Sequence, residues 1–129
     1  MNNQVSDPGE VVVAMVEALV AHGEHTLEGH PGMEHLKRLW PSVKQAFPDF
    51  RAEVQQQLTQ GDRVASHWVF SGTHSGTLFG IPATGKNVRF QNLSIARVVD
   101  QKVVQYNSET GWLDFLMQVG ALPMKEVSR

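Results

Sequence analysis

Apolar side chains recur at helical spacing near the start of the chain. They form a single stripe made of Val12, Met15, Val16, Leu19 and Val20. Asp7 can cap this helix by accepting a backbone N–H, and Pro8 suits the first helical position. Glu10 stands three residues after the cap and completes a capping box, while Gly23 is a suitable stop. The pattern therefore predicts a helix that begins at Pro8 and ends before Gly23.

Residues 22–32 are rich in His and Gly and predict a loop. A second helix is expected after Pro31, with one apolar side composed of Met33, Leu36, Leu39, Trp40, Val43 and Phe47. Pro41 removes a backbone donor and crowds the carbonyl four residues back, so a kink or a break is expected near Trp40. Pro48-Asp49 ends this segment.

From Phe50 the period of the pattern changes to two, which predicts strands. The first has an apolar face of Phe50, Ala52, Val54 and Leu58, although Gln56 interrupts it, and Gly61-Asp62 signals a turn. The second strand is expected from Arg63 to Ser75, with Val64, Trp68 and Phe70 opposite His67 and Ser71. Further elements are expected at 87–99 and 102–108 (strands) and at about 111–119 (a helix that Gly120 stops, with Leu122 folding back).

Strands joined by short turns imply an antiparallel sheet, and helices segregated from them imply an α+β fold with the helices on one sheet face. We expect a single domain over residues 1–129, with residues 1–7 and 124–129 as frayed tails.

Composition narrows the classes of function. The 129 residues carry 11 Lys and Arg against 13 Asp and Glu, a formal charge of −2, so no basic excess favours nucleic acid. The absence of cysteine excludes a disulfide scaffold, a thiolate zinc site and a cysteine nucleophile. The N-terminal residues lack a signal-peptide pattern, and no apolar run reaches the ~20 residues of a membrane span. We expect a cytoplasmic protein that binds neither nucleic acid nor membrane.

The segment Gly72-Thr73-His74-Ser75-Gly76, followed by Leu78-Phe79-Gly80-Ile81-Pro82 and Thr84-Gly85-Lys86, resembles the SnoaL-like polyketide cyclase family of the nuclear transport factor 2-like superfamily. The stretches 47–49, 96–100 and 118–123 fit the same pattern, and the resemblance covers roughly residues 30–123. It implies a cone-shaped roll with a bent antiparallel sheet, an apolar pocket and often a sheet-to-sheet homodimer. Relative to this pattern the N-terminal region looks short, so part of the pocket wall is expected to be missing.

The resemblance also implies site positions. The family's catalytic Asp falls at Ser108, its catalytic His at Ser94, a second His at Tyr106 and a flanking amide at Asn92. A serine hydroxyl has no useful basicity near neutral pH unless another group activates it. Two hypotheses therefore stay open. The protein binds a small apolar or polyketide-like molecule and cyclises, isomerises or hydroxylates it, with Tyr106 as acid and Asn92 and Ser94 polarising a carbonyl. Alternatively, it is a non-catalytic small-molecule-binding or homo-oligomeric accessory protein.

Trp68, Phe70, Phe90 and Trp112 are expected to line a pocket for an aromatic ligand. His22, His25, His30 and His35 lack a metal-binding spacing, and the glycines at 76, 80 and 85 lack a phosphate-loop pattern, so we expect no metal and no cofactor. His74 is expected to be structural, His67 to lie on the outer sheet face, and Glu109 to point away from the pocket. Leu93, Ile95 and Val103 are expected to form an outward apolar face that mediates dimerisation.

Placing Ser94 and Ser108 on one face sets a condition on the last hairpin. A two-residue turn at Asp100-Gln101 with regular pairing would put them on opposite faces. We therefore expect Val98 to pair with Lys102, Ser94 with Tyr106 and Asn92 with Ser108. The loop then holds three residues, with Gln101 at positive φ.

Overall fold

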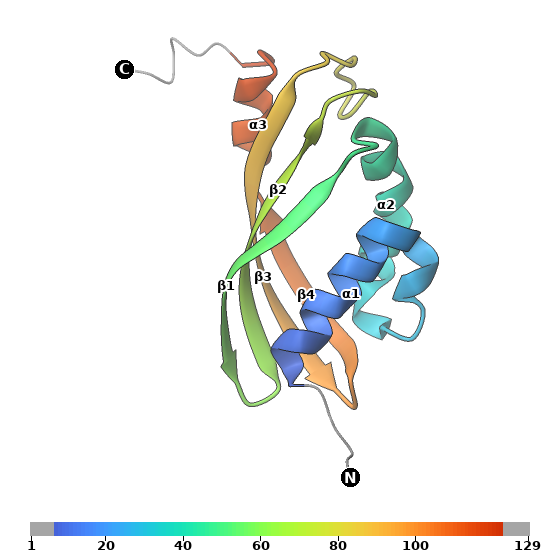
Figure 1. The fold of residues 1–129 in the computed structure, drawn as a ribbon, viewed down its shortest axis with the longest axis vertical. Coiled ribbons are helices and arrows are strands. Elements are labelled where there is room, and N and C mark those ends of the chain that lie inside the picture. The colour runs from blue at the N-terminus through green and yellow to red at the C-terminus, as the bar shows by residue number, and fades with distance from the viewer. Residues whose placement is uncertain (1–6, 123–129) are drawn as a thin grey trace.

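The computed structural model describes residues 7–122. A single antiparallel sheet, with strand order β1-β2-β3-β4, curves around helices on one face (Figure 1). In chain order the elements are α1 (Pro8–His22), η1 (Glu24–Leu27), η2 (Pro31–Met33), α2 (Glu34–Ala46), β1 (Arg51–Gln60), β2 (Arg63–Thr73), β3 (Asn87–Val99), β4 (Lys102–Thr110) and α3 (Trp112–Gln118). The predicted α+β class and the four antiparallel strands are confirmed. The second strand was predicted to end at Ser75, whereas β2 ends at Thr73.

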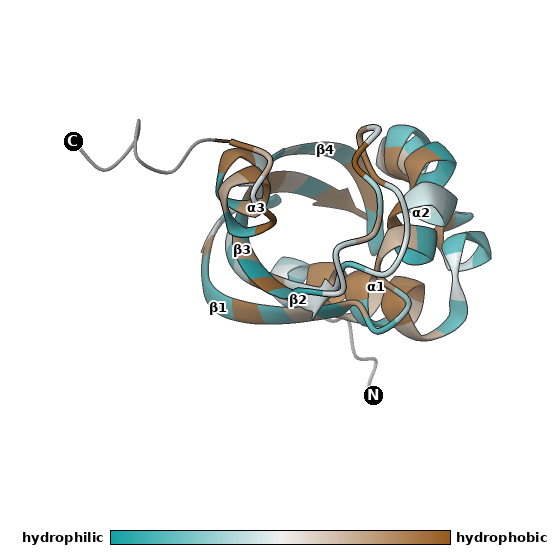
Figure 2. Cartoon of the chain, turned by 90° about the horizontal axis from the view of Figure 1, so that it is seen from above, coloured by the Kyte–Doolittle hydropathy of each residue, from teal (hydrophilic) through white to brown (hydrophobic). Residues whose placement is uncertain are grey.

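The view from above shows the strands bent into an open roll, with α1 and α2 on the inner side and α3 against one edge (Figure 2). We call the face turned toward α1 and α2 the inner face and the opposite one the outer face. Buried apolar residues from the helices and from alternate strand positions fill the inner side. Among the described residues, no helix is long and apolar enough to cross a membrane.

Helix α1 begins as predicted. The Asp7 carboxylate accepts the Glu10 backbone N–H at 2.9 Å, and the Glu10 side chain accepts the Asp7 N–H at 3.3 Å. Asp7 thus belongs to the helix cap rather than to a frayed tail; residues 1–6 and 123–129 lie outside the described residues. The predicted stop is also confirmed, because Gly23 adopts φ 102°. Val12, Met15, Val16 and Leu19 are buried on the expected stripe.

The segment between the two long helices differs from the prediction. It contains two short 3₁₀ helices rather than an irregular loop. Helix α2 then continues through Pro41, so the predicted break is absent. Trp40 is buried and meets Phe50 edge-on at 5.2 Å, and this packing offsets the backbone bond that proline cannot make. The apolar side is narrower than predicted, since Leu39 is 46% exposed.

A β-bulge in β1 explains why Gln56 interrupts the apolar series. Val54 pairs with Trp68 and Gln56 with His67, which leaves Gln55 as the extra residue. The bulge reverses the alternation, so Leu58 faces outward rather than joining the inner side as predicted. Its side chain is 66% exposed.

A second bulge decides the register of β3 and β4. Val99 pairs with Lys102 across a two-residue turn, so the predicted three-residue loop is wrong. Asp100 (φ 52°) and Gln101 (φ 63°) both have positive φ, as a type I′ turn requires, and the predicted sign at Gln101 is correct. Val98 then pairs with Val103 and Arg97 with Gln105, which leaves Val104 as the extra residue.

This bulge corrects two further predictions. Ser94 opposes Ser108 rather than Tyr106, and Asn92 opposes Thr110 rather than Ser108. The common face of Ser94 and Ser108 is nevertheless retained, because directly opposite residues of an antiparallel pair project to the same side. Val103 turns inward and is fully buried, so it is not part of the outward apolar face.

Candidate functional site: an inner cavity

A cavity of about 90 Å³ lies between α1, α2 and the inner face of the sheet. Its apolar wall comes from both long helices and from the aromatic rings of Trp40, Phe50, Phe70 and Trp112. Its polar wall comes from β3 and β4, which present Asn92, Tyr106, Ser108 and Thr110. These four polar side chains are gathered because alternate residues of adjacent antiparallel strands share one face.

Only some of the polar atoms on this side of the cavity have hydrogen-bond partners within the protein. Asn92 Nδ2 donates to Thr110 Oγ1 at 2.9 Å, whereas Asn92 Oδ1 has no protein partner. Whichever way the amide is turned, one of its two ends stays free. Ser94 Oγ and Trp68 Nε1 are also buried without a hydrogen-bond partner in the protein. Buried polar atoms are normally paired, so a cluster of three on the inner face is unusual. Only Asn92 of the three residues borders the cavity, so its amide is the candidate recognition group.

Tyr106 lies next to this cluster. Burial raises the pKa of its phenol above the ordinary value of 10.0, and the nearby Ser94 hydroxyl offsets part of that rise without forming a hydrogen bond of normal geometry. At neutral pH the phenol is therefore protonated. It can donate a hydrogen bond but cannot serve as a base.

The predicted aromatic lining needs correction. Trp112 and Phe70 border the cavity, but Trp68 and Phe90 do not, and each is only 1% exposed. Both project from the inner face into the hydrophobic core, where Phe90 packs against Phe47, Phe70, Trp112 and Phe115. Trp68 and Phe90 are therefore core residues behind the cavity wall. Ser108 borders the cavity on the edge strand and is exposed to solvent.

No acidic side chain and no histidine borders the inner cavity within residues 7–122. Glu109 pairs with Leu93 and borders the opposite, outer face, as predicted. The same described range contains no cluster of three His, Asp or Glu residues that could hold a metal ion. The arrangement can bind and orient a molecule through hydrogen bonds. It offers no side chain that takes up a proton near neutral pH.

Two histidines have structural roles. His74 is fully buried, its ring meets Phe47 and Phe115 at 6.0 and 5.2 Å, and Nδ1 lies 3.0 Å from Thr84 Oγ1. His30 Nδ1 accepts the Val103 backbone N–H at 3.0 Å, next to the bulge in β4. Sequence reasoning missed this contact because it joins residues 73 positions apart. The one available signal was a histidine directly before Pro31.

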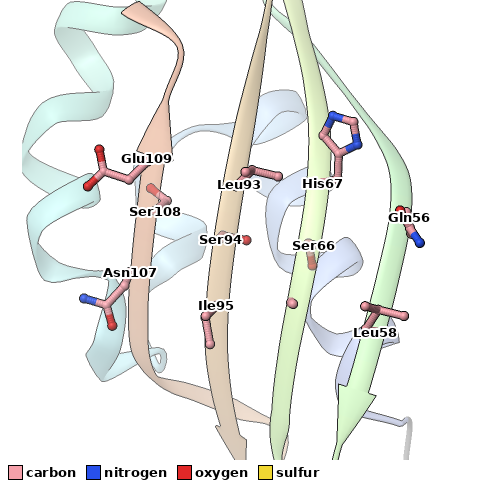
Figure 3. Close-up of a pocket in the computed structure, with 11 residues that line it drawn as sticks. Gln56, Leu58, Ser66, His67, Leu93, Ser94, Ile95, Asn107, Ser108 and Glu109 are labelled. Atoms are coloured by element: carbon pink, nitrogen blue, oxygen red, sulfur yellow. The ribbon is translucent and has the colours of Figure 1, made fainter.

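A second, larger hollow of about 540 Å³ lies on the outer face of the sheet. Leu58, Leu93 and Ile95 form its apolar part and are 66%, 59% and 54% exposed. His67 and Glu109 stand on either side of Leu93 in one row across the strands (Figure 3). His67 Nε2 lies 2.6 Å from Gln91 Oε1, and its place on the outer face is as predicted.

Comparisons with known proteins agree with this architecture. A family model described as SnoaL-like polyketide cyclase matches residues 3–119. AclR from Streptomyces galilaeus, a proposed hydroxylase, shares 25% identity at a TM-score of 0.80, over 90% of this chain and 97% of its own. IdmH from Streptomyces antibioticus, a proposed polyketide cyclase, shares 26% identity at a TM-score of 0.77, over 89% and 99%.

A SnoaL-like protein from Jannaschia sp. CCS1 shares the fold at 18% identity, with a TM-score of 0.73 over 95% of this chain and 100% of its own. No curated protein matches the sequence at a significant level. The near-complete coverage of AclR and IdmH corrects the expectation of a shortened N-terminal region, because this chain spans almost all of both.

Proposed function

Because the chain belongs to the SnoaL-like polyketide cyclase family, which the match over residues 3–119 shows, we propose that it binds a small, neutral, mostly apolar molecule carrying an oxygen atom in its inner cavity. The observation that carries this proposal is the different composition of the two cavity walls. One is made of aliphatic and aromatic side chains, and the other contains the Asn92 amide, whose Oδ1 is buried without a protein partner. Ligand sites commonly combine an apolar lining with a few placed polar groups.

The lining favours a neutral ligand. Among the described residues, no charged side chain borders the inner cavity. Burying an ionised carboxylate or ammonium without a countercharge is strongly unfavourable. An anionic or cationic molecule would therefore bind much more weakly than a neutral one of the same shape.

The polar wall favours an oxygen-containing ligand. The protonated Tyr106 hydroxyl is a donor, and the free end of the Asn92 amide adds a second hydrogen-bonding group to the same wall. A ligand carbonyl can accept from Tyr106 or, with the Asn92 amide turned, from Nδ2, and a ligand hydroxyl can also donate to Asn92 Oδ1. Leaving them unpaired in an apolar cavity costs free energy on the order of 1–3 kcal/mol each, which ligand binding can recover.

The catalytic alternative is cyclisation, isomerisation or hydroxylation of a polyketide-like molecule, with Tyr106 as acid and Asn92 and Ser94 polarising a carbonyl. The names of AclR and IdmH favour such reactions in relatives. The lining of the inner cavity favours binding instead. An aldol-type step needs a base, and Ser94 and Ser108 stand where the family resemblance expects a His and an Asp.

A matched pair of probes tests the binding function. Acetophenone is neutral with one ring and one carbonyl, and benzoate has nearly the same shape with a negative charge. NMR titration is expected to give saturable shifts near Asn92 and Tyr106 with acetophenone and none with benzoate at equal concentration. Asn92→Leu conserves volume and removes the amide, so it should weaken acetophenone binding. Equal binding of both probes, or binding unchanged by Asn92→Leu, would contradict the proposal.

Native mass spectrometry of protein purified from its own host then identifies the class of natural ligand. A retained neutral molecule that Asn92→Leu fails to retain would support the binding function. A covalently altered product released on incubation with that molecule would favour the catalytic alternative.

We also propose that a second copy of the chain covers the outer face. Leu93 and Ile95 lie side by side on β3 with polar residues around them, which is the usual anatomy of an interface. His67 and Glu109 flank Leu93 from β2 and β4. A two-fold axis parallel to β3 brings the β2 side of one copy over the β4 side of the other. Each His67 then faces Glu109 of the second copy, so the polar flanks complement each other.

A further inference from the structure

A short hairpin between β2 and β3 carries an exposed aromatic ring in an unfavourable backbone conformation. Leu78 and Ile81 exchange both backbone hydrogen bonds, at 3.0 and 2.8 Å, which leaves Phe79 and Gly80 as a two-residue turn. Both have positive φ, 54° and 74°. This turn type favours Asn, Asp or Gly at its first position, because a bulky side chain there is strained. Phe79 is nevertheless present, and its side chain is 57% exposed.

The Phe79 ring has two aromatic contacts. The nearer is with Trp112, which it meets edge-on with ring centroids 4.9 Å apart and an interplanar angle of 84°, and the other is with Phe115 at 6.4 Å. Trp112 also packs against the buried rings of Phe90 at 5.2 Å and Phe115 at 5.9 Å. Trp112 also borders the inner cavity, and no other residue of α3 does so within the described chain. The indole is therefore clamped between a fixed core ring and a ring at the tip of a surface hairpin.

The two sides of this clamp differ in how firmly they are held. Phe90 lies in the central strand β3, paired with Phe70 of β2. The hairpin tip, residues 77–84, makes no backbone hydrogen bond to another element in the described structure. Leu78 is buried, Ile81 is partly buried, and Thr84 contacts the His74 ring. The side chains of the tip thus anchor it, and Phe79 is its outermost contact.

The inner cavity is small while Trp112 stays in place, and this limits the size of the ligand. An apolar cavity of about 150 Å³ accommodates benzene, whereas this one measures about 90 Å³. Displacing the Trp112 indole is one change that would enlarge the cavity, because Trp112 is partly buried and stands at the start of a short helix. What holds Trp112 in place therefore limits the size of the ligand.

We propose that Phe79 restrains Trp112 against the inner cavity and thereby determines how large a molecule the cavity admits. This inference rests on the proposed binding function. The residue that sets the size limit then lies outside the cavity lining, since Phe79 itself does not border the cavity. The backbone strain at Phe79 is consistent with selection of the ring for this contact, because Asn or Gly would fit the turn better.

The test uses Phe79→Asn, which removes the ring and suits the positive φ, so the fold is expected to be retained or stabilised. Leu113→Asn is the matched control, because Leu113 is 63% exposed on α3 beside Trp112 and forms none of the aromatic contacts. The full chain is labelled with 5-fluorotryptophan. Its three tryptophans give three ¹⁹F resonances, and Trp112→Phe identifies the one from Trp112. Binding is followed with N-phenyl-1-naphthylamine, a bulky neutral fluorescent probe, and with the smaller acetophenone.

Phe79→Asn is expected to broaden the Trp112 resonance, because the indole gains mobility, and to leave the resonances of Trp40 and Trp68 unchanged. A shift of the Trp112 resonance alone does not count as support, since loss of the neighbouring aromatic ring moves the resonance even when the indole stays in place. Phe79→Asn should speed association of N-phenyl-1-naphthylamine several-fold and that of acetophenone to a lesser extent, because the smaller molecule requires less displacement of Trp112. Leu113→Asn should match the wild type in both measurements. An unchanged linewidth of the Trp112 resonance in Phe79→Asn, or equal acceleration by Leu113→Asn, would overturn the inference.

The ¹⁹F measurement needs no ligand, so the restraint on Trp112 and the binding function are tested independently. If the Trp112 resonance broadens but no form of the protein binds either probe, the restraint on Trp112 is supported and the binding function is contradicted. If acetophenone binds at Asn92 and Phe79→Asn does not enlarge the range of probes accepted, the binding function is supported and the role of Phe79 is contradicted.

Discussion

Ser94 on β3 lies directly opposite Ser108 on β4, with both side chains on the inner face of the sheet. Opposite residues of an antiparallel pair have Cβ atoms about 4.5–5.5 Å apart. Introduced side chains at these two positions would therefore meet. These are the positions where the family resemblance places a His and an Asp, and serine hydroxyls do not supply the acid–base chemistry of that pair.

This relationship predicts the behaviour of an introduced pair. In Ser94→His combined with Ser108→Asp, the carboxylate should stabilise the protonated imidazole. The pKa of that imidazole should then be higher than in Ser94→His alone, which serves as the control. Titration followed by NMR measures both values. Equal pKa values would show that the two side chains do not meet across the strands.

Tyr106 is the only tyrosine, so alkaline titration by ultraviolet absorbance reports on it alone. Burial raises its pKa in the folded state above 10.0. As the pH rises above about 10, the unfolded chain loses the phenolic proton before the folded chain does. The free energy of unfolding should therefore fall between pH 10 and the higher folded-state pKa.

Tyr106→Phe should remove this part of the alkaline dependence in denaturant unfolding. A tyrosine titration midpoint at or below 10 in the native protein would contradict the buried position of the hydroxyl.

The partial burial of His30 predicts that the stability of the protein declines at acidic pH. Burial, and to a smaller extent Lys102, lowers the pKa of its imidazole from the usual 6.5. The unfolded chain then binds a proton at a higher pH than the folded chain, so this contribution to stability is complete above 6.5 and declines as the pH falls toward the lower folded-state value. His30→Ala should remove this dependence. It should also lower the melting temperature at pH 8, since the Val103 N–H loses its acceptor.

His35 is the matched control for His30, because it is exposed on α2. His35→Ala should leave the pH dependence of the melting temperature as in the wild type. If His35→Ala and His30→Ala behaved alike, the His30–Val103 contact would not be the cause.

The backbone conformation of Gln101 predicts that glycine at this position stabilises the protein. Its φ of 63° is readily adopted by glycine but costs other residues on the order of 1 kcal/mol. Gln101→Gly should therefore stabilise the protein by up to about 1 kcal/mol in urea unfolding. Gln105→Gly, at an exposed position within β4, should destabilise it instead, because strand glycines lose more backbone entropy. Stabilisation by both variants would point to an effect unrelated to the turn.

The outer face predicts dimerisation. Sedimentation at micromolar concentration should show a dimer for the wild type and a monomer for Leu93→Lys, because burying an unpaired ammonium in an apolar interface is unfavourable. Leu113→Lys changes an equally exposed leucine away from this face and should stay dimeric. A wild-type monomer at these concentrations would contradict the proposed interface.

Several elements follow from the sequence alone because they depend on neighbours within a few residues. The capping box of Asp7 and Glu10, the stop at Gly23 and the bounds of the strand from Asn87 to Val99 belong to this group. Each rests on local hydrogen bonds or on side-chain alternation along one strand. The family resemblance likewise came from short motifs, and the match over residues 3–119 confirmed it.

Only the tertiary structure decided the rest, because it depends on how distant segments fit together. The bulges at Gln55 and Val104 cannot be deduced from alternation, since an extra residue is stabilised by the partner strand and by contacts such as that of His30 with Val103. They turned Leu58 outward and Val103 inward. The burial of Trp68 and Phe90 behind the cavity wall, and the contact of Phe79 with Trp112, arise in the same way. An aromatic side chain on the inner face can line a cavity or fill a core, and only the packing of other elements over it determines which.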